Sequence, residues 1–180
     1  MTATDTPTAD QETRTVLVHR IYIKTTPEKV WQAIVDPEWN GRYGYAAPSV
    51  YELRAGGSYR STASEEMRAY SAEHGYDVPD VVVDGEVLES DPPRKLVQTF
   101  RMLMDPRTAE EGFSRLTWEI ADISPGVSRL TVTHDVTGAP NLEALVTGAY
   151  EDQGAGGGGG WAWILSDLKS LLETGAILAG

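Results

Sequence analysis

The sequence contains no cysteine among its 180 residues. Disulfide bonds, thiolate nucleophiles and cysteine-ligated zinc are therefore excluded. A chain without disulfides is compatible with a reducing compartment, and we expect a cytoplasmic protein. Long apolar runs are also lacking, because no stretch approaches the roughly 20 residues needed to span a bilayer.

Positive charge is scarce as well. Lys and Arg number 15 against 27 Asp and Glu, which gives a formal net charge of -12. No basic stripe is visible, and phosphate backbones and anionic lipid surfaces would be repelled by the negative excess. We therefore expect neither nucleic acid nor a membrane among the partners. Three scattered histidines without clustered carboxylates offer no metal-ligand spacing, so we expect no metal site.

The residues that are present fit a globular protein. Hydrophobic residues make up 41% of the chain and charged residues 23%, and this length suits one domain with a real core. Residues 1–13 are rich in Thr, Ala and Asp and lack a signal-peptide pattern, which predicts a disordered tail. Residues 14–180 are expected to form one domain.

Seven short segments are rich in apolar and β-branched residues, and most are bounded by turn signals. Gly56-Gly57 and the sequences SDPPR and ISPG separate neighbouring segments by short turns, which favours an antiparallel meander. The predicted strands cover residues 15–24, 49–53, 58–62, 81–89, 95–104, 113–122 and 127–134.

Helical periodicity follows the first strand and recurs in the loop 64–80. Thr26 and Pro27 are typical of a helix start, and this helix is expected to end at Asp36, before a short turn over residues 39–43. In the loop, Thr62 and Glu65 have capping-box spacing, and Gly75 is expected to end the helix. One face of this helix carries Met67, Tyr70 and His74.

The last helix is the most regular feature of the sequence. Its apolar face has helical spacing, Gly175 can cap its end, and the stripe comprises Trp161, Ile164, Leu165, Leu168, Leu171 and Leu172. Six of the seven residues over 154–160 are glycine, and each glycine in a helix costs about 0.5–1 kcal/mol relative to alanine. The helix should therefore begin near Gly160. The glycines are interpreted either as a tolerated connector or as a gate formed by Gly156, Gly157, Gly158, Gly159 and Gly160.

Six stretches in this order resemble one known superfamily over about residues 15–175. They read TTPEKVWQAIVDPEWN, YELRAGGSYR, GEVLESDPPRKLVQTF, SRLTWEI, SRLTVTHD and GWAWILSDLKSLLETG. The chain resembles the START-like, or SRPBCC, superfamily, in its heat-shock-protein-90 ATPase activator-like and polyketide cyclase-like branch. The resemblance implies one START-like domain over residues 14–180 with an α+β helix-grip fold. In that fold a curved seven-stranded antiparallel sheet wraps around a long C-terminal helix, with two short helices after the first strand.

The resemblance also implies a cavity between sheet and helix. We expect it to bind a small hydrophobic or amphipathic ligand, without a cofactor. The first alternative is a cofactor-independent polyketide cyclase or aromatase in the same cavity, and the second is a stress or chaperone-associated adaptor. The edge strands of an open sheet also leave room for a homodimer.

The candidate ligand contacts are inward-facing residues of the strands and the last helix. Such stripes suit a pocket with few polar groups and equally suit a packed core. The candidates are Tyr59, Gln98, Phe100, Met102, Leu116, Trp118, Val132, His134, Trp161, Leu165 and Leu168. Tyrosines near the expected mouth could bind the polar end of a ligand, and these are Tyr43, Tyr45, Tyr51, Tyr59, Tyr70 and Tyr76.

His134 is the one candidate catalytic residue. It shares a strand face with Leu130 and Val132 by two-residue alternation, which points it inward. A buried imidazole could transfer a proton in a cyclisation or dehydration. The alternative is a structural histidine that is hydrogen-bonded at the edge of the sheet.

Overall fold

The computed structural model describes residues 13–150 and 158–178. Short helices interrupt the series of strands, and one longer helix ends the chain of elements. In chain order they are β1 (Val16–Ile23), α1 (Pro27–Val35), α2 (Pro37–Asn40), β2 (Ser49–Tyr51), β3 (Gly57–Thr62), α3 (Glu65–His74), β4 (Val81–Asp91), β5 (Lys95–Met102), α4 (Pro106–Glu110), β6 (Ser114–Ser124), β7 (Val127–Asp135), α5 (Pro140–Val146) and α6 (Gly160–Thr174).

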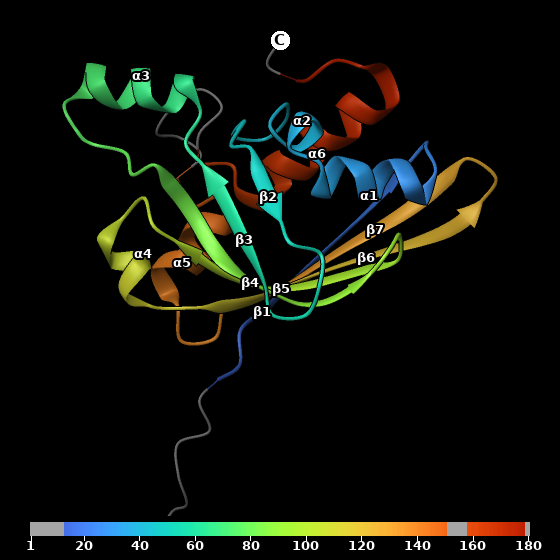
Figure 1. Cartoon of the computed structure of the whole chain (residues 1–180), viewed down its shortest axis with the longest axis horizontal. Helices are drawn as coiled ribbons and strands as arrows, with labels where there is room; N and C mark the ends of the chain where they lie inside the picture. Colours follow the sequence, from blue (N-terminus) through green and yellow to red (C-terminus); the bar gives the residue numbers. More distant parts are fainter. Residues whose placement is uncertain (1–12, 151–157, 179–180) are drawn as a thin grey trace, which may run out of the picture.

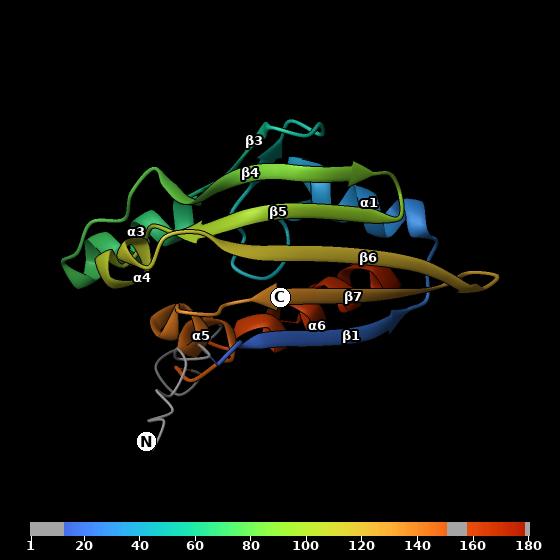
Figure 2. The same ribbon diagram turned by 90° about the horizontal axis from the view of Figure 1, so that it is seen from below.

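The seven strands of the described residues form one antiparallel sheet in the order β1-β7-β6-β5-β4-β3-β2. Strands β2 to β7 are therefore a meander, and β1 joins it beside the last strand. The sheet is strongly curved, and α1, α2 and α6 lie on its concave side (Figure 1). The view from below shows the opposite face, where the strands run side by side (Figure 2). This is the predicted α+β helix-grip fold, which is confirmed.

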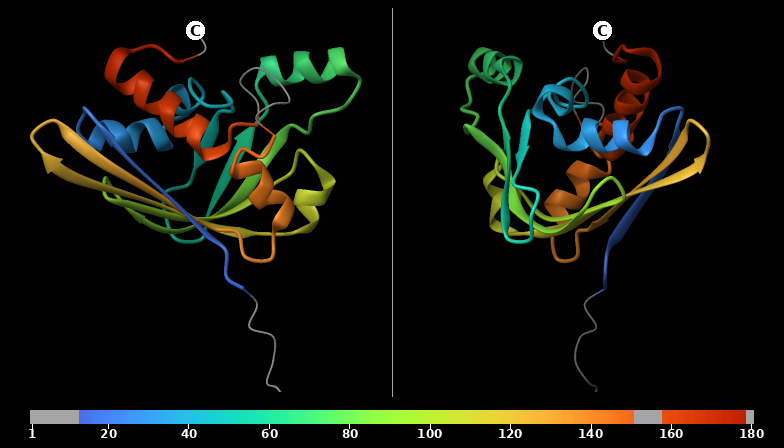
Figure 3. Two further views of the ribbon diagram at one scale, coloured as in Figure 1. Left: turned by 180° about the vertical axis from the view of Figure 1, so that it is seen from behind. Right: turned by 45° about the vertical axis from the view of Figure 1, so that its right-hand side comes forward.

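Alternation along the strands places apolar side chains on the concave face. In β6 the buried residues are Leu116, Trp118 and Ile120, and the corresponding positions of β7 are Leu130 and Val132. These side chains pack with α1 and α6 in one hydrophobic cluster. Figure 3 shows α6 lying across the hollow of the sheet, as a wide apolar helix face requires.

Two features near β4 and β5 differ from a regular sheet. A Cβ atom on Gly85 would lie 2.1 Å from the carbonyl oxygen of Thr99, so only glycine fits this close approach. The pairing of β4 with β5 also shifts register between Val87 and Glu89. Such irregularities increase local bending and twist, and they occur in β4 and β5, which border the cavity described below.

The predicted helix ends are partly confirmed. Helix α6 begins at Gly160 and ends before Gly175, whose φ is 79°, as expected. Thr26 occupies the N-cap of α1, but its side chain makes no capping hydrogen bond. Helix α3 is capped by Ser64, whose Oγ accepts from the amide of Met67 at 3.2 Å, so the predicted role of Thr62 is wrong.

Two short helices escaped prediction. Strand β5 ends at Met102, and α4 follows after a turn. Helix α5 lies between β7 and the glycine run, where no element was predicted. Each has proline at its start, and each is too short for its periodicity to be recognised in sequence. The predicted tail falls on residues outside the described part of the chain, apart from Thr13.

Candidate functional site

A cavity of about 410 Å³ lies between the concave sheet face and α6. Its sheet side is formed by side chains such as Tyr59, Phe100 and Met102, from β3 and β5. Trp161 and Ile164 of α6 lie on the helix side. The exposed Met104, after β5, also lines it, which places the opening at this end of the sheet.

The loop between α2 and β2 forms part of the cavity wall and is tied to α6 by three hydrogen bonds. The buried carboxylate of Asp167 accepts from the amide of Gly44 at 2.8 Å. The indole of Trp163 donates to the Gly44 carbonyl at 3.3 Å. The hydroxyl of Tyr45 accepts from the amide of Gly160 at 3.1 Å. Loop and helix therefore form one wall.

Five of the eleven predicted contacts line this cavity, namely Tyr59, Phe100, Met102, Trp118 and Trp161. The other six are buried but do not line it, namely Gln98, Leu116, Val132, His134, Leu165 and Leu168. Gln98 lies behind Tyr51 and Tyr59 at the edge of the cavity. The other five belong to the packed interior under α6, where strand and helix side chains meet directly. Alternation in sequence shows only that a side chain faces inward, and the distance to the helix decides whether space remains.

The gating prediction concerns five glycines. Gly156 and Gly157 lie outside the described residues. Gly160 is buried with φ 58°, and a Cβ atom there would lie 2.2 Å from the carbonyl oxygen of Val146. Glycine is thus required at the start of α6 by its contact with the end of α5. Gly158 lines the cavity, and a gating role for the run stays a prediction.

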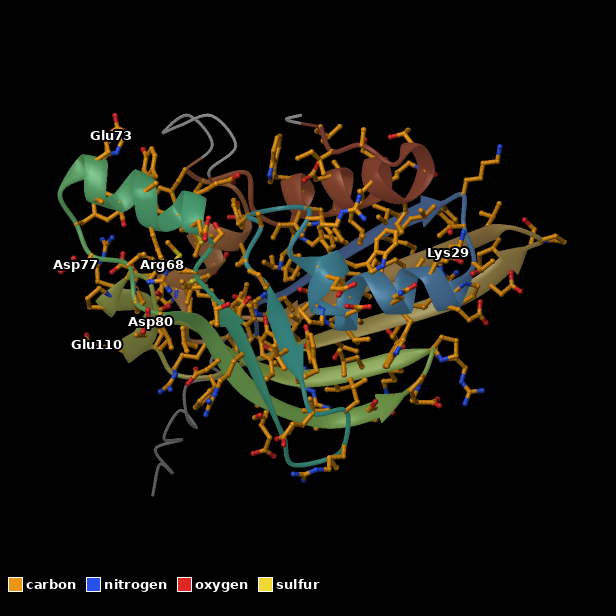
Figure 4. All side chains as sticks on the ribbon, turned by 45° about the horizontal axis from the view of Figure 1, so that its top comes forward. Lys29, Arg68, Glu73, Asp77, Asp80 and Glu110 are labelled. Carbon is orange, nitrogen blue, oxygen red and sulfur yellow. The ribbon has the colours of Figure 1, made fainter. Side chains whose placement is uncertain are left out.

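Helix α3 lies at the open end of the cavity, and Met67 is its lining residue. Tyr70 and His74, which were expected to share its face, stack on each other at 4.0 Å and are exposed. Charged side chains cover the outer side of this helix and the segment after it, with Glu73 and Asp77 projecting outward (Figure 4). Helix α3 therefore contributes one apolar side chain to the cavity and a polar surface to solvent.

The polar end of the cavity is built by β2 and β3. Tyr51 and Tyr59 are register partners, and their rings stack at 4.7 Å. Burial raises the pKa of both phenols, and in Tyr51 the neighbouring Tyr59 raises it further. Both are therefore protonated at neutral pH. The sequence predicted Tyr59 as a ligand contact but Tyr51 only as a residue near the mouth. The expected hairpin pairing of Tyr51 with Tyr59 could have identified Tyr51 as a ligand contact as well.

Gln98 lies behind these phenols and is fully buried. Its Oε1 accepts from the indole Nε1 of Trp118 at 3.3 Å, which fixes the orientation of the amide. Its Nε2 has no hydrogen-bond partner among the described residues. The amide is close enough to Tyr51 and Tyr59 to oppose, in small part, the rise of their pKa.

His134 is a structural residue in this geometry. The indole of Trp161 donates to its Nδ1 at 3.1 Å, and an indole can only donate. A neutral ring therefore carries its proton on Nε2, which meets the Ser114 hydroxyl at 2.8 Å. That hydroxyl in turn lies 3.0 Å from the Phe100 carbonyl and donates to it. The chain of hydrogen bonds uses both ring nitrogens.

Burial lowers the pKa of His134 to about 4. Protonating Nδ1 would also bring two donors face to face, which opposes the charged form. The expected position at the sheet edge is wrong, since β7 lies between β1 and β6. The residue joins α6 to the sheet and does not face the cavity.

Neither metal ligands nor membrane helices are found within residues 13–150 and 158–178. No group of three His, Asp or Glu side chains there could hold a metal ion. None of the helices in these ranges combines the length and apolar character that a membrane crossing requires.

Several solved structures share the fold. MLL2253 from Mesorhizobium loti has a TM-score of 0.61 at 19% identity, with 88% of this chain and 96% of that chain covered. CalU16 from Micromonospora echinospora has a TM-score of 0.54 at 16% identity, with 77% and 71% covered. PFC0360w, an HSP90 activator from Plasmodium falciparum, has a TM-score of 0.50 at 18% identity, with 67% and 71% covered. At these identities the likeness concerns the fold alone.

Sequence comparison gives the family. No curated protein matches the chain. The model of the family described as Activator of Hsp90 ATPase homolog 1-like protein matches residues 24–173, from the end of β1 to the last turn of α6. The match spans most of the chain, and the protein therefore belongs to the family of Activator of Hsp90 ATPase homolog 1-like proteins.

Proposed function

We propose that the chain binds a small, mainly apolar molecule in the cavity between the sheet and α6. The observation that carries the proposal is the cavity of about 410 Å³, which the side chains around it leave unfilled. Ligand pockets typically measure about 300–1,000 Å³ and are apolar with a few polar groups. Aromatic walls from Phe100, Trp118 and Trp161, with two phenols at one end, fit that description.

The walls are also held in place before any ligand arrives. Trp118 and Trp161 meet edge to face at 5.4 Å, and each indole has its own acceptor, in Gln98 and His134 respectively. Such preorganisation lowers the entropy that binding must otherwise cost. The cavity is therefore suited to bind a rigid apolar molecule without rearrangement of its aromatic walls.

The test uses N-phenyl-1-naphthylamine, a neutral probe that becomes fluorescent in apolar surroundings. We expect saturable enhancement with the wild-type chain. The variant Met102→Trp places a larger ring in the cavity and should weaken binding at least about tenfold, equivalent to about 1.4 kcal/mol. The matched control is Val18→Trp, on an exposed position of β1, which should bind like wild type. Absence of saturable binding to the folded wild-type chain would contradict the proposal.

Catalysis through His134 is not favoured by this geometry. Both ring nitrogens are engaged and its low pKa leaves it neutral at physiological pH. The ring is separated from the cavity by Phe100 and Trp161, whose rings contact it at 5.2 and 5.8 Å between centroids. A general base must reach the proton that it removes.

The family match is the one observation in favour of a second candidate function, contact with an Hsp90-type chaperone. The test is the ATPase rate of a purified chaperone of this type with and without the chain. Stimulation at stoichiometric concentration, lost on addition of excess competing chaperone fragments, would support this candidate. An unchanged rate together with the absence of a complex would remove it.

A further inference from the structure

The polar groups of the cavity fall into two sets. In the first set every side chain already has a partner. Tyr43 donates to the Ala33 carbonyl at 3.1 Å, and Ser49 and Ser61 contact each other at 2.7 Å and both reach the Ala47 carbonyl. These groups have their donors satisfied by the protein itself.

Tyr51, Tyr59 and Gln98 form the second set. Neither phenol hydroxyl makes a hydrogen bond of ordinary length and angle to a described residue, although the two hydroxyls and Gln98 lie close together and Ser49 and Ser61 lie near Tyr59. The Nε2 of Gln98 is buried without a partner. If the Gln98 amide donated to one phenol oxygen and one phenol donated to the other, one phenol O–H group would still be available to donate to an acceptor from outside. Unpaired buried donors are costly, so this corner is suited to receive an acceptor from outside.

The charges around the cavity restrict that acceptor further. Among the described residues that line it, Asp105 is the only charged one. Its carboxylate accepts from the backbone amide and guanidinium of Arg107. A buried carboxylate or phosphate of a ligand would therefore lose its hydration without meeting a cation, which is strongly unfavourable.

We infer that the ligand is a neutral, largely aromatic or alicyclic molecule with a carbonyl-type oxygen, which accepts hydrogen bonds from Tyr51 and Tyr59 with the Gln98 amide behind them. This inference rests on the proposed function of the cavity. It narrows the ligand class to ketones, quinones, esters and similar neutral acceptors, and it excludes fatty acids and other anions with a buried head group.

Three naphthalene probes that differ only in one substituent test the inference. Acetylnaphthalene carries a neutral carbonyl, ethylnaphthalene replaces it by an apolar group, and naphthoate replaces it by an anion at the same ring position. Dissociation constants are measured by titration of tryptophan fluorescence in the full chain. We expect the ketone to bind about tenfold more tightly than the ethyl compound and naphthoate to bind most weakly.

The variants Tyr51→Phe and Tyr59→Phe remove one oxygen each, singly and together. The advantage of acetylnaphthalene over ethylnaphthalene should shrink in each single variant and vanish in the double variant. Binding of ethylnaphthalene should stay unchanged, which a loss of the cavity would not allow. Tyr22→Phe is the matched control, because Tyr22 lies on β1 and is half exposed.

The outcomes separate this inference from the proposed function. Equal affinity of ketone and ethyl compound, or strongest binding of naphthoate, overturns the inference and leaves the cavity proposal intact. If the chain binds N-phenyl-1-naphthylamine but not acetylnaphthalene, the inference is likewise overturned and the cavity proposal stands. If none of the four probes binds the folded chain, both are overturned.

Discussion

The space under α6 has two halves that look alike in sequence and differ in the folded protein. The packed half contains Leu116, Val132, His134, Leu165 and Leu168, which are all buried and do not line the cavity. The hollow half contains Tyr51, Tyr59, Phe100, Met102 and Ile164, which surround about 410 Å³. Both halves are built from inward-facing strand residues and one face of α6.

The two halves also treat their polar groups differently. In the packed half His134 is joined on both sides to Trp161 and Ser114, so no donor is left over. In the hollow half the Gln98 Nε2 is buried without a partner among the described residues, and it lies beside the phenols of Tyr51 and Tyr59. Under α6, the buried polar group of the packed half is therefore fully paired, whereas the one beside the cavity keeps an unpaired donor.

The largest expected difference between the halves concerns truncation of apolar side chains. Leu168→Ala should lower the free energy of unfolding by about 3 kcal/mol, because it opens a cavity in a fully packed region. Met102→Ala should cost only about 1 kcal/mol, since one side of this half-buried side chain already faces a cavity. Urea unfolding measures both. Equal losses would show that the hollow half is packed as tightly as the other.

The next effect is a pH dependence that belongs to the packed half. The pKa of His134 is about 4 in the fold against 6.5 ordinarily, so the unfolded chain takes up the proton first as the pH falls. The contribution of the neutral imidazole to the free energy of unfolding is therefore complete above pH 6.5 and is lost as the pH falls towards 4. Acidification from pH 7 to pH 5 should lower the free energy of unfolding by about 2 kcal/mol through this residue.

The measurement compares urea unfolding of the wild type and His134→Gln at the two pH values. The variant should be less stable at pH 7 and lose about 2 kcal/mol less on acidification. His74→Gln, at an exposed position of α3, serves as the control and should follow the wild type. A wild-type pH dependence that survives in His134→Gln would show that the imidazole is not held neutral by its surroundings.

The smallest effect distinguishes two tyrosines that both line the cavity. Tyr43→Phe removes a hydroxyl that donates to the Ala33 carbonyl and should cost about 1 kcal/mol. Tyr59→Phe removes a hydroxyl that makes no hydrogen bond of ordinary length and angle to the protein, and it should change stability by less than about 0.5 kcal/mol. Thermal or urea unfolding without ligand resolves the two. A cost for Tyr59→Phe as large as that for Tyr43→Phe would mean that the fold itself uses this hydroxyl.

This contrast explains how far the sequence could lead. Periodicity was sufficient for the strands and for α6, because burial of one face leaves a repeat of two or about 3.6 residues. It could not separate Leu116 from Phe100, since both face inward and only the distance to α6 decides which one borders open space. The same limit applied to His134, whose partners Ser114 and Trp161 are brought together only by strand register and helix placement.

Other details were hidden for local reasons. The short helices α4 and α5 offer too few residues for a periodic pattern. The unpaired state of Gln98 depends on the indole of Trp118 in the neighbouring strand, so no local pattern marks it. The glycine run suggested a movable segment, whereas Gly160, the first residue of α6, must be glycine because it contacts the Val146 backbone closely.

The position of β1 has a consequence for the order in which the molecule can form. Its residues pair with β7, so that Arg20 bonds to Thr131 across 111 positions of the chain. A growing polypeptide makes β1 early, but that strand has no ladder to join until β7 has been synthesised. Strands β2 to β7 can meanwhile pair with their sequence neighbours, one hairpin after another. Sheet completion therefore depends on a late long-range closure, which is slower than hairpin formation and leaves an unpaired strand exposed to other chains until it occurs.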